Sequence, residues 1–214
     1  MTFSIVAFLP ETGELGVAVA TCKPAIGGRV PFVRAGAGAV ASQAVGNAWL
    51  GATALALLAR GTPARAALEA ALAIDPTPDV RQLHLVDAGG QPAAWTGAAT
   101  PDWKGHRLGA GYSVAGNTLV GPTVLERMAA AYEATASDLA ARLLAALEAG
   151  DAAGGDRRGR QSAGLVVVRG EPFPYVDVRV DDDPHPLVPL RRILALYRAD
   201  RLATPRPRAD YLKA

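Results

Sequence analysis

Residues 2–20 constrain the fold of this chain most, because they predict two β-strands joined by a tight turn. Residues 2–8 and 15–20 are rich in strand-forming side chains, and Pro and Gly lie in the connection between them. This pattern is typical of a β-hairpin. The first strand begins at residue 2, and a strand that reaches a chain end is usually fixed in a sheet. We therefore expect Thr2 to be held in a sheet.

Thr2 carries the chemistry of a nucleophile with its own base, provided that Met1 is removed. The side-chain hydroxyl of an N-terminal threonine attacks, and its free α-amine, with an ordinary pKa of about 7.7 to 8.0, takes the proton. Many chains begin with Met-Thr, so the dipeptide alone does not establish catalysis. While Met1 is present, the nitrogen of Thr2 belongs to a peptide bond and cannot act as this base.

Composition narrows the class of protein and of ligand. The 214 residues, half of them hydrophobic, suit one large domain. A net charge of +2 gives no support for nucleic acid or an acidic membrane as a partner, so we expect a small-molecule or short-peptide ligand. The single Cys22 cannot form an internal disulfide, and no apolar run reaches the roughly 20 residues that span a bilayer. We predict a cytoplasmic protein.

The remaining pattern predicts further strands and paired helices. We expect strands near residues 30–45, a hairpin over 81–97, a polar loop over 102–111, strands over 112–120 and 165–180, and helices over 47–61, 62–74, 124–132, 138–149 and 184–197. The small residues of the strand near 35–45 imply that another element packs closely on it. This order favours an α+β fold in which two sheets pack together with helices outside, a four-layer α/β/β/α sandwich. We expect one domain over 1–203 and a mobile tail over 204–214.

Several segments, taken in order, resemble the DUF1028 family of N-terminal-nucleophile (Ntn) hydrolases. The similarity is most specific where the opening strand occurs together with the run Gly-Gly-Asp-Arg-Arg-Gly-Arg-Gln-Ser, and the matching segments are 2–7, 14–20, 38–44, 116–117, 154–163 and 178–182. The resemblance implies the four-layer Ntn-hydrolase fold and, by analogy with that superfamily, hydrolysis of an amide bond. It implies no particular substrate.

The resemblance gives roles to three candidate catalytic residues. Thr2 would attack an amide carbonyl and form an acyl-enzyme ester that water releases. Asn117 would donate a hydrogen bond to the tetrahedral oxyanion; alternatively, it only adopts a turn beside Gly116. Asp156 would hold an ammonium group of the substrate.

Five further residues are candidates for substrate binding. Arg157 or Arg160 would grip a carboxylate; alternatively, the charges of this loop pair with one another in solvent. Ser42 and Gln43 would line the pocket, or they only satisfy backbone groups. Lys23 would lower the pKa of a neighbouring amine, or it is a solvated surface residue.

One histidine and one cluster of acidic residues are assigned no chemical role. His84 alternates with leucines, so we interpret it as a strand residue with one face in water. Asp181, Asp182, Asp183 and His185 lie close together, but no metal-ligand spacing is present. We therefore expect neither a metal nor a cofactor.

Two functions of different classes follow from these residues. The first is an amidohydrolase that cleaves a small non-cyclic amide, a ureide or a short peptide through Thr2. The second is a catalytically silent Ntn-fold protein that binds a ligand or acts as a scaffold. The apolar helices outside a sheet also leave room for a homodimer.

Overall fold

A computed structural model of the chain describes residues 2–202 and contains two antiparallel sheets and five α-helices in that range. The larger sheet has the order β10-β9-β2-β1-β8-β7, and the smaller has the order β3-β4-β5-β6. The strands are β1 (Thr2–Leu9), β2 (Glu14–Thr21), β3 (Pro31–Arg34), β4 (Gly38–Ala44), β5 (Arg81–Asp87), β6 (Pro92–Thr96), β7 (Gly105–Gly109), β8 (Tyr112–Asn117), β9 (Ser162–Val168) and β10 (Pro174–Val180). The tail expected over 204–214 lies outside the described residues.

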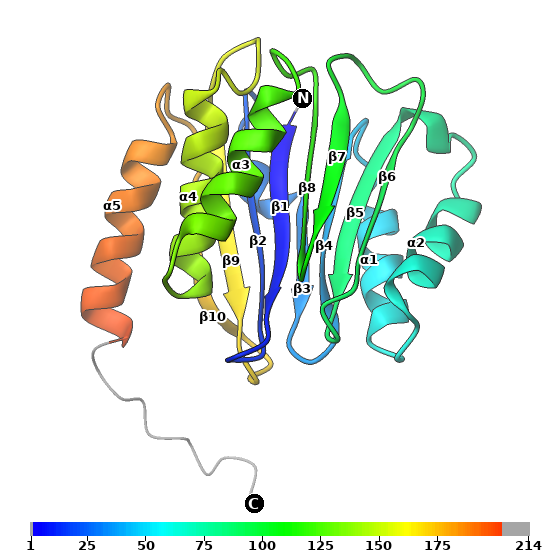
Figure 1. Cartoon of the computed structure of the whole chain (residues 1–214), viewed down its shortest axis with the longest axis horizontal. Helices are drawn as coiled ribbons and strands as arrows, with labels where there is room; N and C mark the ends of the chain where they lie inside the picture. Colours follow the sequence, from blue (N-terminus) through cyan, green and yellow to red (C-terminus); the bar gives the residue numbers. More distant parts are fainter. Residues whose placement is uncertain (1, 203–214) are drawn as a thin grey trace, which may run out of the picture.

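The helices cover the outer faces of the two sheets (Figure 1). They are α1 (Ala48–Leu58), α2 (Ala64–Ala73), α3 (Thr123–Ala134), α4 (Leu139–Ala152) and α5 (Leu187–Tyr197). Helices α3, α4 and α5 contact the larger sheet, whereas α1 and α2 contact the smaller one. Strands β1 and β8 of the larger sheet contact β4 and β5 of the smaller sheet, so the inner faces of the sheets pack on each other. In residues 2–202 no helix has both the length and the apolar character needed to cross a bilayer.

Strand β1 separates two kinds of interior because successive side chains of a strand point to opposite faces. Phe3, Ile5 and Ala7 belong to the apolar cluster beneath α3, α4 and α5. Val6 belongs to the cluster between the two sheets. Ser4 is therefore on the inter-sheet side with Val6, and Thr2 continues this side at the start of the strand.

The structure confirms the hairpins and most helices and corrects two expectations. Residues 105–109 of the predicted polar loop form β7, whose pattern is polar because β7 is the edge strand of the larger sheet. Gly150 does not end α4, which continues to Ala152. A Cβ at Gly150 would lie 2.7 Å from Cγ of Met128, so this glycine allows α3 and α4 to approach. The cap at Asn47 is confirmed, since its Oδ1 accepts the backbone N–H of Trp49 at 3.1 Å.

The small residues of β4 do allow close packing, as the sequence predicted. A Cβ added to Gly38 would lie 2.6 Å from the carbonyl oxygen of Val86 and 2.5 Å from Cδ1 of Leu58 in α1. The carbonyl belongs to the paired strand β5 and cannot move away without breaking the ladder. Glycine at position 38 therefore sets the distance between α1 and the smaller sheet.

Replacing Gly38 with alanine is expected to destabilise the fold by about 1–3 kcal/mol, because the added methyl overpacks this contact. Gly46→Ala is the matched control, since a Cβ there would meet no atom within 4 Å. Urea unfolding of both variants measures the difference. Equal midpoints for the two variants would show that α1 does not pack on β4 in this way.

Candidate functional site

Three neighbouring strands bring Thr2, Thr21 and Asn117 together at one end of the larger sheet. Thr2 is the cross-strand partner of Asn117 on β8. On the other side, Oγ1 of Thr2 donates a hydrogen bond to Oγ1 of Thr21 on β2, at 3.4 Å. The site is enclosed, because Thr2 is 4% exposed and Asn117 is 0% exposed. We call these three residues the threonine site.

The loop that carries Asp156 closes the same end of the sheet. Asp156 forms an isolated β-bridge with Leu119, just beyond β8. Its Oδ2 accepts the backbone N–H of Cys22, just beyond β2, at 3.2 Å, and its Oδ1 accepts the backbone N–H of Arg158 at 2.8 Å. The Asp156 side chain is 1% exposed. Thr2, Asn117 and Asp156 thus converge at one sheet end, although they are far apart in the sequence.

The neighbouring basic residues make contacts with other parts of the protein. Arg157 donates from Nη2 to the backbone oxygen of Asp102, and Arg160 pairs through Nε with the carboxylate of Asp151. Both arginines are exposed, and so is Lys23. Neither arginine pairs with another charge of its own loop, as the alternative had expected; Arg158 does so, with Nη2 3.4 Å from Oδ2 of Asp156. The carboxylate-binding role of Arg157 and Arg160 stays a prediction.

Ser42 and Gln43 lie on opposite faces of β4, so they do not line one pocket. Oγ of Ser42 donates to the backbone oxygen of Asn47 at 2.9 Å, and its strand partner Leu83 belongs to the cluster under α1 and α2. Gln43 faces the larger sheet, where its Oε1 accepts the hydroxyl of Ser4 at 2.6 Å. The expectation that both residues line one pocket is therefore wrong for Ser42, because neighbouring strand residues alternate in direction.

A chain of buried side-chain amides connects Asn117 with the smaller sheet. Nδ2 of Asn117 donates to Oε1 of Gln82 at 2.9 Å. The same oxygen accepts Nε2 of Gln43 at 2.8 Å. We call Gln43, Gln82 and Asn117 the amide chain. All three are buried, and sequence reasoning overlooked Gln82.

His84 is buried between the sheets, which corrects the expectation that it has one face in water. It is 0% exposed, with Nε2 2.7 Å from Oγ of Ser4 and Nδ1 3.1 Å from Oγ of Ser113. Burial, with a smaller contribution from nearby His106, lowers the pKa of His84 to about 3. The signal in the sequence was that Gln82 and His84 share one face of β5, and polar residues also alternate on β1 and β8.

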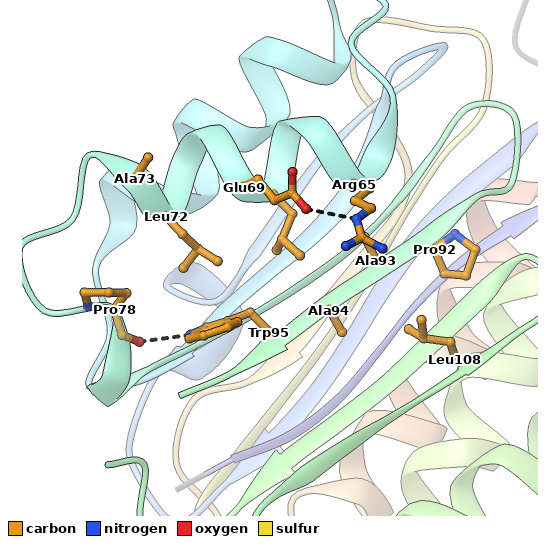
Figure 2. Close-up of a pocket in the computed structure, with 11 residues that line it drawn as sticks. Arg65, Glu69, Leu72, Ala73, Pro78, Pro92, Ala93, Ala94, Trp95 and Leu108 are labelled. Carbon is orange, nitrogen blue, oxygen red and sulfur yellow. Dashed lines mark hydrogen bonds and ion pairs between the residues drawn. The ribbon is translucent and has the colours of Figure 1, made fainter. Parts of the chain in front are cut away.

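Two cavities of the described chain lie away from the threonine site. The larger, of about 550 Å³, is a groove between α2 and strands β6 and β7 (Figure 2). Leu72, Trp95 and Leu108 line it, and the Trp95 indole donates to the backbone oxygen of Pro78 at 3.0 Å. A smaller one lies between α4 and α5. Within residues 2–202 no three or more His, Cys, Asp or Glu side chains are grouped so that they could hold a metal ion.

Comparisons with known proteins relate the chain to a family and to solved structures. A family model described as "Family of unknown function (DUF1028)" matches residues 2–190. The crystal structure of a DUF1028 protein from Silicibacter pomeroyi is 34% identical, with a TM-score of 0.88, over 94% of this chain and 88% of that one. Anbu (ancestral beta-subunit) from Yersinia bercovieri is 12% identical over 96% of this chain and 99% of that one, with a TM-score of 0.43. No curated protein is similar enough to count as a match.

The low pKa of His84 predicts sensitivity to acid. Because the folded pKa lies below the unfolded value of about 6.5, the unfolded state binds the proton more tightly. The stability associated with neutral His84 is full above pH 6.5 and is lost as the pH falls towards 3, with about 2 kcal/mol lost at pH 5.

Thermal unfolding of the wild type and of His84→Gln between pH 7.5 and 5 tests this expectation. The variant should lose less stability across this range than the wild type does. His106, whose pKa is also lowered by burial, titrates in both proteins, so the difference reports on His84. Parallel pH profiles would contradict the assignment.

Proposed function

Because the chain belongs to the DUF1028 family, whose function is unknown, we propose from the site itself that the protein is an amidohydrolase of the N-terminal-nucleophile type. Its substrate is a small non-cyclic amide, a ureide or a short peptide. The observation that carries the proposal is the position of Thr2, at the start of a central strand, with its hydroxyl against Thr21 and with Asn117 as cross-strand neighbour. Helices on the outer faces of two packed sheets support the four-layer α/β/β/α sandwich of this class.

The reaction begins once Met1 has been removed in the cytoplasm and the α-amine of Thr2 is free. Oγ1 of Thr2 attacks the amide carbonyl while the α-amine takes the hydroxyl proton. The carbon–nitrogen bond breaks, the leaving nitrogen receives that proton, and an ester to Thr2 remains. Water, activated by the same amine, then hydrolyses the ester and releases the acid.

Asn117 and Asp156 support this chemistry in different ways. Nδ2 of Asn117 gives one N–H to Gln82, so its second N–H is available for the oxyanion, a role worth about 2.7–4 kcal/mol of barrier. Both carboxylate oxygens of Asp156 already accept backbone N–H groups. Asp156 therefore positions the end of β2, and its contact with a substrate ammonium stays a prediction. Neither the homodimer nor a role for Lys23 is needed for the reaction, and both stay predictions.

The enclosure of Thr2 favours a second candidate function. Thr2 is 4% exposed, and the two cavities described above are lined by other residues. A catalytically silent Ntn-fold protein would keep this site closed and bind its ligand at another place, such as the apolar groove beside Trp95. The two candidates differ in whether turnover depends on Thr2.

Intact-mass measurement of protein made in a cytosol with normal methionine processing is the first test of the hydrolase. We expect a mass that lacks Met1. Periodate, which cleaves the amino alcohol of a free N-terminal threonine, should then modify the denatured protein. Retention of Met1 would leave Thr2 without its base and would overturn the proposed mechanism.

Substitution of Thr2 tests the nucleophile. With p-nitrophenyl acetate and a library of small amides, Thr2→Ser should keep part of the turnover, and Thr2→Ala should lower it by about 10³-fold or more. Ser42→Ala is the matched control, because this hydroxyl lies on the α1 side of β4 and should not affect the rate. Turnover that survives Thr2→Ala would favour another nucleophile, and ligand binding without turnover would favour the silent protein.

A further inference from the structure

The orientation of the Gln82 carboxamide is fixed by its surroundings. Its Nε2 lies 3.0 Å from the backbone oxygen of Gly105, 2.9 Å from that of Gly116 and 2.9 Å from Oγ1 of Thr96. Backbone carbonyl oxygens only accept hydrogen bonds, so the NH₂ end must face them. The opposite end, Oε1, therefore faces the threonine site as an acceptor.

The fixed oxygen of Gln82 in turn fixes Asn117. Oε1 of Gln82 accepts Nδ2 of Asn117 at 2.9 Å and Nε2 of Gln43 at 2.8 Å. If Asn117 turned its carboxamide over, two acceptor oxygens would face each other in a buried space, which is costly. The Asn117 NH₂ thus points to Gln82, and its Oδ1 is directed away from Gln82.

Oδ1 of Asn117 is buried and has no hydrogen-bond partner among the residues that the structure describes. A buried acceptor in this state costs about 1–3 kcal/mol, so a donor that reaches it is bound favourably. Carboxamide oxygen accepts only, and Asn117 is the cross-strand neighbour of Thr2. The complementary ligand group is therefore a donor beside the nucleophile.

We propose that Gln82 is a positioning residue that aims Oδ1 of Asn117 at the substrate nitrogen, so that the enzyme selects amides that carry an N–H. This inference rests on the proposed function and narrows its substrate class to primary and secondary amides. The N–H donates to Oδ1 while Thr2 Oγ1 attacks the adjacent carbonyl. The carbon–nitrogen bond then breaks, and the nitrogen leaves as an amine with the proton passed through the α-amine. Esters and tertiary amides, whose nitrogen carries two carbon substituents besides the acyl group, lack this donor.

Three chromogenic probes with the same acetyl group test the selection. p-Nitroacetanilide carries the N–H, its N-methyl derivative replaces that hydrogen by a methyl group, and p-nitrophenyl acetate is the ester. Asn117→Leu should lower kcat/KM for the N–H anilide by about tenfold more than for the other two probes. Loss of an oxyanion donor alone would lower kcat/KM for all three probes alike, because the hydrolysis of each probe passes through an oxyanion.

Gln82 and Gln43 provide a matched pair of variants. Gln82→Leu removes the group that orients Asn117, so it should reproduce the selective loss on the N–H anilide. Gln43→Leu removes the other donor to the same Gln82 oxygen. It should leave unchanged the ratio of kcat/KM for p-nitroacetanilide to kcat/KM for its N-methyl derivative. Equal effects of Asn117→Leu on all three probes would overturn the inference but leave a Thr2-dependent hydrolase in place. Absence of Thr2-dependent turnover of every probe would count against the proposed function.

The orientation of Gln82 can be measured without any activity. In Asn117→Asp, a carboxylate would be buried and would face the fixed oxygen of Gln82, and both raise the pKa of the new carboxyl group. The melting temperature of this variant, taken relative to the wild type at the same pH, should be several degrees lower at pH 8 than at pH 5. The wild-type series corrects for the nearby titratable groups His84, His106 and Asp156. If the variant's melting temperature lies equally far below that of the wild type at both pH values, the Gln82 carboxamide can turn over. That result would overturn its positioning role.

Discussion

The polar groups buried between the two sheets need hydrogen-bond partners there, and the arrangement of the molecule depends on this constraint. Along β1 the interior changes in character: Val6 packs among apolar residues of both sheets, whereas Ser4 and Thr2 face polar partners. Buried polar groups are tolerated only when they are hydrogen-bonded. The bonds of the amide chain and of His84 meet that demand across the sheets for every atom of these side chains but Oδ1 of Asn117, so they fix the register of β5 against β1 and β8.

This polar interior also fixes where the side chains of the threonine site lie. Each member of the threonine site stands on a strand, and strands hold side chains more precisely than loops do. The one loop that takes part is itself fixed by Asp156, which bonds the backbone of Cys22 and of Arg158. A functional group placed here is held by the same hydrogen bonds that hold the two sheets together. The stability of the fold and the chemistry proposed for the threonine site therefore depend on shared residues.

Local signals predicted the parts of this architecture that have local causes. The first hairpin, the cap at Asn47 and the small residues of β4 follow from turn chemistry, capping and close packing, and the structure agrees with them. Edge strand β7 was not predicted from the sequence, because exposure on both sides removes the alternation of polar and apolar residues that marks a strand. His84 and Gln82 were misjudged or overlooked because alternation divides a strand into two faces without saying what covers each one. Only the packing of a second sheet on β1 and β8 reveals that the polar face is the buried one.

The position of β1 has a consequence for the biosynthesis of the chain. In the larger sheet β1 lies between β2, which follows it at once, and β8, whose residues 112–117 are synthesised much later (Figure 1). At ordinary translation rates the ribosome needs on the order of 6 to 20 s to reach β8. During that interval the amino end can pair on one side only, and an aminopeptidase has access to it. Arrival of β8 ends this interval, so the removal of Met1 that the proposed mechanism requires has its widest opportunity before β8 pairs with β1.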